Sequence, residues 1–371
     1  MTEHPGVRAG DFGVYVHVPF CAARCDYCAF ATWTDRGHLM AGYARACVTE
    51  IERAVAGGMP EATSVFFGGG TPSLLPAADL VAILDAVPRR PGAEVTVECN
   101  PETVDDALLG AYREGGVNRV SLGVQSLVPH VLAGLGRRHT PGRVQEAVAA
   151  VGQAGLTSFN VDLIYGGAGE SDTDWAATLA GVAALDPVPP HVAAYALTVE
   201  PGTPLAADLA RHPDDDVQAD RYEAADRFLS AAGLRWYEIS NWARPGHECR
   251  HNQLYWDQGD YQGVGCAAHS HRAGRRWWNL RTPERYLAAI EAGRSPVAAG
   301  EELDAGARAV EGAQLSLRTR AGVPAGALPP DPDLEGLVER RGGRAVLTLR
   351  GRLLANEVSG RLGVAPPGPP P

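Results

Sequence analysis

Short apolar, β-branched runs alternate with longer Ala- and Leu-rich segments from Gly13 to about Ser240. This alternation is typical of βα units that build a parallel sheet. We count six units and expect an α/β fold in which a partial (β/α)6 TIM-like barrel places ligand-binding loops at the carboxyl ends of its strands. The predicted strands are Val14–Val18, Ser64–Phe67, Glu94–Glu98, Arg119–Gly123, Ser158–Ile164 and His191–Leu197, with helices centred near residues 48, 82, 109, 147, 178 and 225.

The pattern changes after these units. Arg235–Ser240 predicts a further strand, whereas Asn241–Asn279 is rich in Gly, aromatic and His residues and has little helical periodicity. We therefore expect a long functional loop there. Thr282–Ala292 predicts a helix, and a smaller, mainly helical module with the strand Ala345–Leu349 follows from about Leu303.

These patterns divide the chain into five parts. The division consists of an N-terminal extension (1–12), a barrel domain (13–240), a linking region (241–302), a C-terminal helical domain (303–362) and a Pro-rich tail (363–371). We expect the end of the tail, Ala365–Pro371, to be disordered because of its composition.

Composition narrows the classes of function. Acidic residues outnumber basic ones by 44 to 33, which argues against a general nucleic-acid-binding surface. No apolar stretch reaches about 18 residues, and the first residues do not resemble a signal peptide, so we expect a cytoplasmic protein without a transmembrane segment. Three of the seven cysteines lie within eight positions, which favours a metal site in a reducing compartment over disulfides.

Cys21, Cys25 and Cys28 form a Cys-x3-Cys-x2-Cys motif in the loop after the first predicted strand. Three thiolates can hold three corners of a [4Fe–4S] cluster and leave the fourth iron open to an exchangeable ligand. A ferredoxin or a structural zinc site would need a fourth cysteine nearby. Ordinary buried thiols are the weaker alternative, because polar residues separate the three cysteines. The remaining cysteines are scattered: Cys47, Cys99, Cys249 and Cys266.

This cysteine loop resembles the signature of the radical SAM superfamily. The resemblance implies that the open iron binds the amino and carboxylate groups of S-adenosylmethionine (SAM), whose C5′–S bond the reduced cluster cleaves. The Gly68–Gly70 turn after the second strand fits this, although alone it indicates only a tight βα turn. Glu98, Gln125 and Asp162 recur at later strand ends, where ribose hydroxyls could satisfy buried carboxylates, and Arg137 could pair with the methionine carboxylate.

With Tyr195–Thr203 and Tyr237–Asn241, these motifs resemble the oxygen-independent coproporphyrinogen III dehydrogenase (oxidase)-like branch of the superfamily, over roughly residues 13–360. Gly263–His269 resembles a further loop of the branch, whose contacts we do not align. The resemblance implies SAM contacts at Tyr15, Tyr27, Gly69, Gly70, Thr71, Glu98, Gln125, Arg137, Asp162 and Ala196.

Two features separate the dehydrogenase from the heme chaperones of the same branch. The dehydrogenase has a fourth cysteine two positions after the third, whereas this chain has Phe30 and the chaperones have an aromatic residue there. The second feature is the chaperones' His-Asn-x-x-Tyr-Trp motif, matched by His251, Asn252, Tyr255 and Trp256. A neutral imidazole can ligate heme iron, and the aromatic rings can cover the macrocycle. In the alternative, these residues belong to a packed loop in which His251 only donates or accepts hydrogen bonds.

We therefore favour a radical SAM-type heme chaperone and assign no catalytic residue. The resemblance implies that heme is delivered to respiratory apoproteins of the cytoplasmic membrane through peripheral contact, and that an iron-storage protein can donate it. The alternative is an oxygen-independent coproporphyrinogen III dehydrogenase of porphyrin biosynthesis. A radical SAM enzyme acting on an unrelated small molecule is a third class, because barrel and cluster do not fix the substrate.

Overall fold

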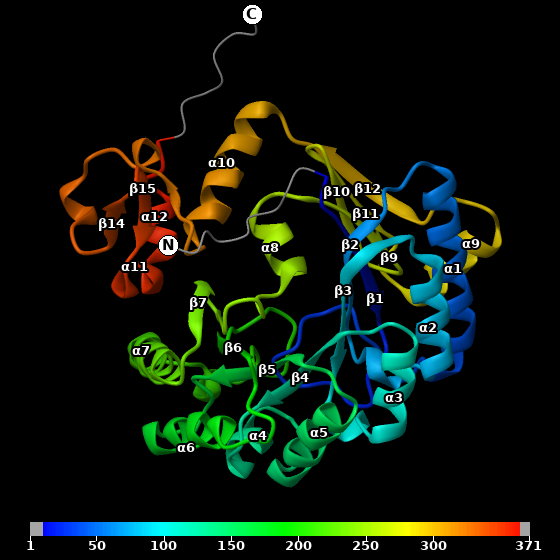
Figure 1. Cartoon of the computed structure of the whole chain (residues 1–371), viewed down its shortest axis with the longest axis horizontal. Helices are drawn as coiled ribbons and strands as arrows, with labels where there is room; N and C mark the ends of the chain where they lie inside the picture. The colour runs from blue at the N-terminus through cyan, green and yellow to red at the C-terminus, as the bar shows by residue number, and fades with distance from the viewer. Residues whose placement is uncertain (1–9, 364–371) are drawn as a thin grey trace, which may run out of the picture.

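One curved sheet forms the centre of the computed structural model, which describes residues 10–363 (Figure 1). Residues 1–9 of the predicted N-terminal extension and residues 364–371 of the predicted tail lie outside the described residues. Six parallel strands neighbour one another in sequence order, which confirms the partial (β/α)6 barrel. They are β1 (Phe12–Val18), β2 (Ala62–Gly69), β3 (Arg89–Cys99), β4 (Arg119–Gln125), β5 (Ser158–Tyr165) and β6 (His191–Ala196).

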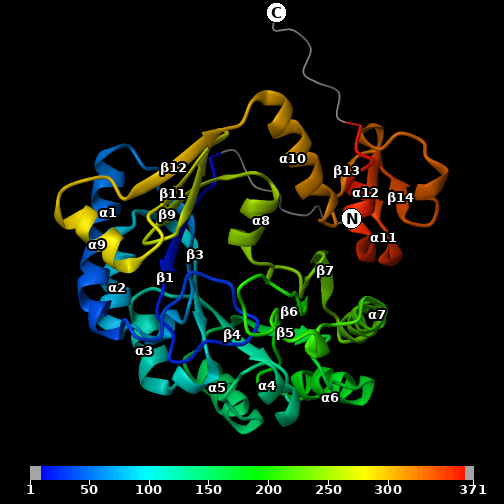
Figure 2. The same cartoon turned by 180° about the vertical axis from the view of Figure 1, so that it is seen from behind.

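The helices between these strands cover the convex face of the sheet (Figures 1 and 2). Successive side chains of a strand point to opposite faces of the sheet. In β1, Val14, Val16 and Val18 point toward these helices and are completely buried. The covering helices are α1 (Met40–Ala56), α2 (Ala77–Ala86), α3 (Asp106–Glu114), α4 (Pro129–Gly134), α5 (Pro141–Gln153), α6 (Asp172–Ala183) and α7 (Asp215–Ala231).

Six further strands lengthen the sheet at both edges. Beyond β6 lie β8 (Asn241–Ala243) and β7 (Arg235–Glu238), where the sequence predicted a strand. Beyond β1 lies β9 (Asp260–Val264), which runs parallel to β1 and pairs Gly263 with Tyr15. The outer strands of this edge are antiparallel: β10 (His269–Arg272), β11 (Arg275–Asn279) and β12 (Val297–Glu302).

The long loop predicted over residues 241–279 is therefore wrong in part. This stretch contains β8 to β11 and the helix α8 (Arg250–Trp256). α8 has only seven residues, too few for a helical period to appear, and the edge strands carry many polar residues. α8 lies against the concave face of β1, where an added Cβ on Gly13 would lie 2.6 Å from a methyl carbon of Leu254. The predicted helix at 282–292 is confirmed as α9 (Pro283–Glu291).

The C-terminal module has a hydrophobic cluster of its own, which includes Leu317, Val323 and Val358. Beside its helices it contains a three-stranded antiparallel sheet, of which the sequence predicted only the strand near residues 345–349. The other two strands lack an apolar run, because one has two residues and the other is charged. The elements are α10 (Ala305–Leu317), β13 (Val323–Pro324), β14 (Val338–Arg341), β15 (Arg344–Leu347), α11 (Leu349–Leu353) and α12 (Ala355–Ser359). The domain limits remain a prediction.

No helix in the described part of the chain is both long enough and apolar enough to cross a membrane.

One buried arginine connects the C-terminal module to the barrel. Arg352 on α11 is 5% exposed, and its guanidinium donates hydrogen bonds to Asp226 (2.8 Å) and to the hydroxyl of Tyr222 (3.1 Å), both on α7. It also lies over the Trp236 ring of β7, 4.4 Å from the ring centre. A cation placed over an aromatic face and beside a carboxylate is held by both.

We predict that Arg352→Met lowers the free energy of unfolding by about 3 kcal/mol, because it leaves the largely buried Asp226 carboxylate without its cation. Urea unfolding followed by circular dichroism measures this change. Arg350→Met is the matched control, since Arg350 lies on the same short helix and is exposed. Equal unfolding midpoints for both variants would contradict this assignment.

Candidate functional site

The cysteine loop after β1 is held by backbone hydrogen bonds on several sides. The amide of Cys21 donates to the carbonyl of Trp33 (3.1 Å), and the amide of Trp33 donates to the carbonyl of Pro19 (2.8 Å). Farther along the loop, the Asp26 carboxylate pairs with Arg211 at 2.8 Å. These contacts close the loop on itself and tie it to the segment that carries Arg211.

Cys21, Cys25 and Cys28 line one cavity of about 580 Å³ on the concave side of the barrel, here called the cysteine cavity. All three are partly exposed, whereas Cys47, Cys99, Cys249 and Cys266 are buried. Cys99 also borders the cavity, but its thiol lies 3.6 Å from the carbonyl oxygen of Val97. Burial raises the pKa of Cys21 and Cys28, so a metal must displace their protons when it binds.

The three thiols share a cavity but do not converge on one point. No group of three or more His, Cys, Asp or Glu side chains within residues 10–363 has the geometry of a metal site. The surroundings nevertheless fit a cluster: an arginine of the α4–α5 connection, Arg137, donates to the sulfur of Cys25 (3.4 Å), and Thr71 donates to the sulfur of Cys21 (3.8 Å). Charged donors to sulfur stabilise thiolates.

The glycine turn after β2 lies directly against this loop. The amide of Gly70 donates to the carbonyl of Val18 (2.8 Å), and an added Cβ on Gly70 would lie 2.6 Å from the carbonyl oxygen of Phe20 and 3.0 Å from the sulfur of Cys21. Gly69 has φ +110°, a conformation that side chains rarely adopt. Only glycine therefore permits the turn to approach the cysteine loop so closely.

Two carboxyl groups, Glu98 on β3 and Asp162 on β5, face the cysteine cavity. Burial raises the pKa of Glu98 to about 8, and the nearby charge of Asp162 adds to the effect. Burial also raises the pKa of Asp162 to about 6, although Ser121 and Asn160 donate hydrogen bonds to it. Among the described residues, Glu98 accepts a hydrogen bond only from the amide of Gly69 (3.2 Å). Additional donors, such as ligand hydroxyls, would satisfy this acidic pair.

Gln125 and Arg137 complete the arrangement on the β4 side. Gln125 has φ +64°, and the pairing of β4 with β5 shifts register at this residue. Strained backbone of this kind is often found at functional sites. Arg137 donates to the carbonyl of Gly123 (2.8 Å) and to the side-chain oxygen of Asn100 (2.7 Å), while its buried Nε has no partner among residues 10–363. Asn100, whose role the sequence did not predict, also donates to Thr71 (3.0 Å).

Nine of the ten SAM contacts implied by the sequence resemblance line the cysteine cavity: Tyr27, Gly69, Gly70, Thr71, Glu98, Gln125, Arg137, Asp162 and Ala196. The tenth, Tyr15, does not line this cavity, and its hydroxyl is 3.1 Å from Nδ1 of His17. Phe30 also lines the cysteine cavity, and it is 67% exposed.

The His-Asn-x-x-Tyr-Trp residues lie on α8 but do not line one common cavity. His251 is 1% exposed, its Nδ1 is 2.9 Å from the Ser64 hydroxyl, and its Nε2 is 2.8 Å from the Tyr255 hydroxyl. Burial lowers the pKa of His251 to about 3. His251, Asn252 and Tyr255 border a small inner cavity of about 160 Å³, while Trp256 borders none of the cavities described here. In this conformation neither ring nitrogen of His251 is free to bind iron.

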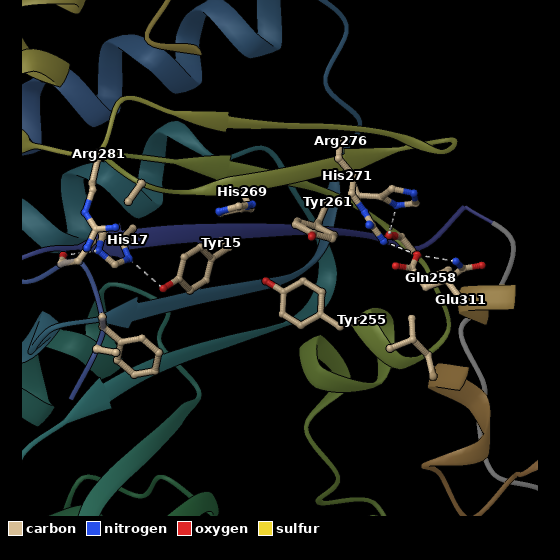
Figure 3. Close-up of a pocket in the computed structure, with 16 residues that line it drawn as sticks. Tyr15, His17, Tyr255, Gln258, Tyr261, His269, His271, Arg276, Arg281 and Glu311 are labelled. Atoms are coloured by element: carbon tan, nitrogen blue, oxygen red, sulfur yellow. Dashed lines mark hydrogen bonds and ion pairs between the residues drawn. The ribbon is translucent and has the colours of Figure 1, made fainter. Parts of the chain in front are cut away.

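A second cavity, of about 570 Å³, lies beside the cysteine cavity between β1, β9 to β11 and α8 (Figure 3). Here it is called the histidine cavity. Ala29 and Phe30 of the cysteine loop line both cavities. The sequence did not predict this cavity, and the only signal for it was the family-like loop at residues 263–269. Its polar and aromatic walls include Tyr15, His17, Tyr255, Tyr261, His269, His271, Arg276 and Arg281.

Comparison with known proteins identifies the family. The model of the radical SAM superfamily matches residues 15–180. The chain is 44% identical to the heme chaperone HemW of Mycobacterium tuberculosis (strain ATCC 25618 / H37Rv) over 96% of its own length and 97% of that protein. It is 38% identical to the heme chaperone HemW of Escherichia coli (strain K12), with 71% of each chain covered.

Among solved structures, the radical SAM enzyme coproporphyrinogen III oxidase (HemN) from Escherichia coli aligns over 94% of this chain and 89% of its own. The TM-score is 0.80 at 23% sequence identity, a likeness that shows the fold. The cysteine loop and the ends of β1 to β5 lie within the region matched by the superfamily model, and the likeness to the two HemW proteins extends well beyond it. The chain therefore belongs to the HemW family of radical SAM proteins.

Proposed function

We propose that this protein is a heme chaperone that carries a [4Fe–4S] cluster on Cys21, Cys25 and Cys28. The observation that supports this most directly is the composition of the cysteine cavity. It contains three partly exposed cysteines, and Phe30 stands where a coproporphyrinogen dehydrogenase has its additional cysteine. The relatives named heme chaperone HemW match almost the whole chain, which supports the same function.

SAM would occupy the rest of the cysteine cavity. Glu98 and Asp162 would accept hydrogen bonds from the ribose hydroxyls, and the Gly69–Thr71 turn would offer bare backbone to the methionine end. Arg137 has a guanidinium that could pair with the methionine carboxylate. When bound, the cluster supplies one-electron reduction of the SAM sulfonium. The protein residues would orient SAM and exclude water from it.

Heme is the proposed cargo, bound through aromatic and histidine side chains. Tyr255 of the His-Asn-x-x-Tyr-Trp motif borders the histidine cavity, and His251 holds its hydroxyl. Delivery to respiratory apoproteins at the cytoplasmic membrane would need peripheral contact only, and an iron-storage protein could act as the heme donor. We propose that the protein works in the cytoplasm.

Oxygen-independent coproporphyrinogen III oxidation is the second candidate function. It is favoured by the likeness in fold to the Escherichia coli oxidase. Phe30 argues against it, because Phe30 stands where the dehydrogenase has its additional cysteine.

We predict that the anaerobically reconstituted protein carries about four irons and four sulfides per chain. Each of Cys21→Ala, Cys25→Ala and Cys28→Ala should abolish the visible absorption of the cluster, because each removes a thiolate ligand. Cys47→Ala is the matched control, since Cys47 is fully buried away from the cavity. Iron and sulfide analysis together with absorption spectra measures the effect. Loss of the cluster on changing Cys47, Cys99, Cys249 or Cys266 would contradict the three-thiolate assignment.

A second prediction concerns SAM. Glu98→Ala and Asp162→Ala should each weaken SAM binding by about 5- to 150-fold, because each loses hydrogen bonds worth roughly 1–3 kcal/mol, while the iron content stays unchanged. Calorimetric titration of the reconstituted protein measures the affinity. Glu200→Ala is the control, since Glu200 is an exposed carboxylate that lines the same cavity but is no proposed contact. Unchanged affinity in both site variants would refute the ribose contacts.

The third prediction separates the two candidate functions. The reconstituted protein should bind heme but form no protoporphyrinogen IX from coproporphyrinogen III, even with SAM and a reductant present. Heme titration and a chromatographic product assay on the same sample measure both properties. Product formation above the background without protein would favour the oxidase.

A further inference from the structure

The histidine cavity has the size and lining expected for a flat aromatic ligand that carries acidic groups. Its volume of about 570 Å³ lies within the range of roughly 300–1,000 Å³ that is common for ligand pockets. Figure 3 shows Tyr15, Tyr255 and Tyr261 in the middle of the view, with Arg281 toward one end, near His17, and Arg276 toward the other, near Glu311. Aromatic walls suit a macrocycle, and the cationic ends suit carboxylates.

Four histidines lie in or next to this cavity, and three of them are fully engaged. His17 contacts Tyr15 and the carbonyl of Ala31 through its two ring nitrogens. His251 on α8 is engaged by Ser64 and Tyr255, as described above. His271 accepts a hydrogen bond from the amide of Gly274 (3.1 Å) and contacts the carbonyl of Gly259 (3.0 Å). These hydrogen bonds leave none of the three imidazoles free to ligate a metal.

His269 differs from the other three histidines. Its side chain is exposed and lies centrally in the cavity view of Figure 3. Within the described part of the chain its ring nitrogens have no hydrogen-bond partner, and its ring stacks on Trp278 with centroids 5.5 Å apart. Partial desolvation by the cavity walls and the charge of Arg276 lower the pKa of His269, so the imidazole is neutral at neutral pH. A neutral imidazole with a free nitrogen is a common heme-iron ligand.

The loop that carries His269 is rigidly anchored. The buried carboxyl group of Glu50 accepts hydrogen bonds from the Gly265 amide (2.8 Å), the Asn279 side chain (2.7 Å) and the Tyr286 hydroxyl (2.6 Å). The amide of Cys266 donates to the hydroxyl of Tyr43 (2.8 Å). This network fixes the backbone at Gly265 and Cys266, shortly before His269, the first residue of β10. The imidazole of His269 is therefore held toward the cavity by residues that do not line it.

The tyrosines of the cavity are poor alternatives as iron ligands. A phenol ligates heme iron as its deprotonated form, and burial raises the pKa of Tyr15, Tyr255 and Tyr261. These three side chains are therefore neutral phenols at physiological pH. They are suited to contact a macrocycle through their ring faces.

The two arginines are not equivalent. Arg276 is paired with Glu311 and with Glu301, and these carboxylates compete with a ligand for its guanidinium. Arg281 is exposed and makes no ion pair or hydrogen bond to any residue of the described chain. A free guanidinium at one end of an aromatic cavity is suited to bind a carboxylate in a bidentate manner.

We propose that heme binds in the histidine cavity with His269 as an axial ligand of its iron and with Arg281 paired to a propionate. This inference rests on the proposed heme-carrier function and names the site. Tyr255 then covers one part of the macrocycle, and His251 acts as a positioning residue that holds the Tyr255 hydroxyl. The cargo lies next to the cysteine cavity, separated from it by Ala29 and Phe30.

The test is a hemin titration of the full-length protein, followed by Soret absorption and low-temperature EPR. His269→Ala should weaken heme binding by about tenfold or more and remove the spectrum of an imidazole ligand. Added free imidazole should restore that spectrum, because it can enter the space left by the side chain. His38→Ala is the matched control, since His38 is exposed and lines neither cavity. His251→Ala should weaken binding but keep the imidazole spectrum.

The proposed pairing of Arg281 with a heme propionate is tested with heme dimethyl ester, in which both propionates are esterified and therefore uncharged. Arg281→Ala should weaken hemin binding and leave binding of the diester unchanged, because only hemin can pair with the guanidinium. If the spectrum is unaltered in His269→Ala and the imidazole spectrum is lost in His251→Ala, His269 is not the axial ligand. The proposed heme-carrier function would stand in that case. Absence of heme binding by the unchanged protein would refute both the site and the proposed function.

Discussion

Close backbone contact between the end of β1 and the glycine turn after β2 is the constraint on which the rest of the site depends. The amides of Gly70 and Thr71 donate to carbonyls of Val18 and Phe20, and no side chain fits at Gly70. This contact fixes the cysteine loop at the carboxyl edge of the parallel sheet. Glu98, near the end of β3, and Asp162, within β5, face the same cavity, which lies toward this edge of the parallel sheet.

The sequence predicted the six parallel strands well, because each buried strand is a short apolar run bounded by helical segments. The sequence did not predict the elements that lack such an apolar run or a helical period. α8 is too short to show a helical period, β13 has two residues, and β14 consists of Val338 followed by three charged residues. Such elements are held in place by tertiary contacts and not by their own pattern.

The residues of the candidate site likewise fall into those that the sequence could predict and those that it could not. Residues at strand ends could be predicted as neighbours, because the fold alone gathers them, and nine of the ten predicted SAM contacts line one cavity. The histidine cavity could not be predicted, since it depends on β9 pairing beside β1 and bringing His269 next to Tyr15. For His251 the sequence indicated the residue type but not its burial, and both ring nitrogens are engaged in this conformation.

β1 physically links the two cavities. Side chains alternate along a strand, so Val14, Val16 and Val18 pack into the core while Tyr15 and His17 point to the concave side. The same strand then leads directly into the cysteine loop, whose Phe30 lines both cavities. A ligand that displaced Ala29 or Phe30 in one cavity would therefore change the walls of the other. Heme loading and occupancy of the cysteine cavity are expected to influence each other through these shared residues, with equal and reciprocal effects on the two affinities.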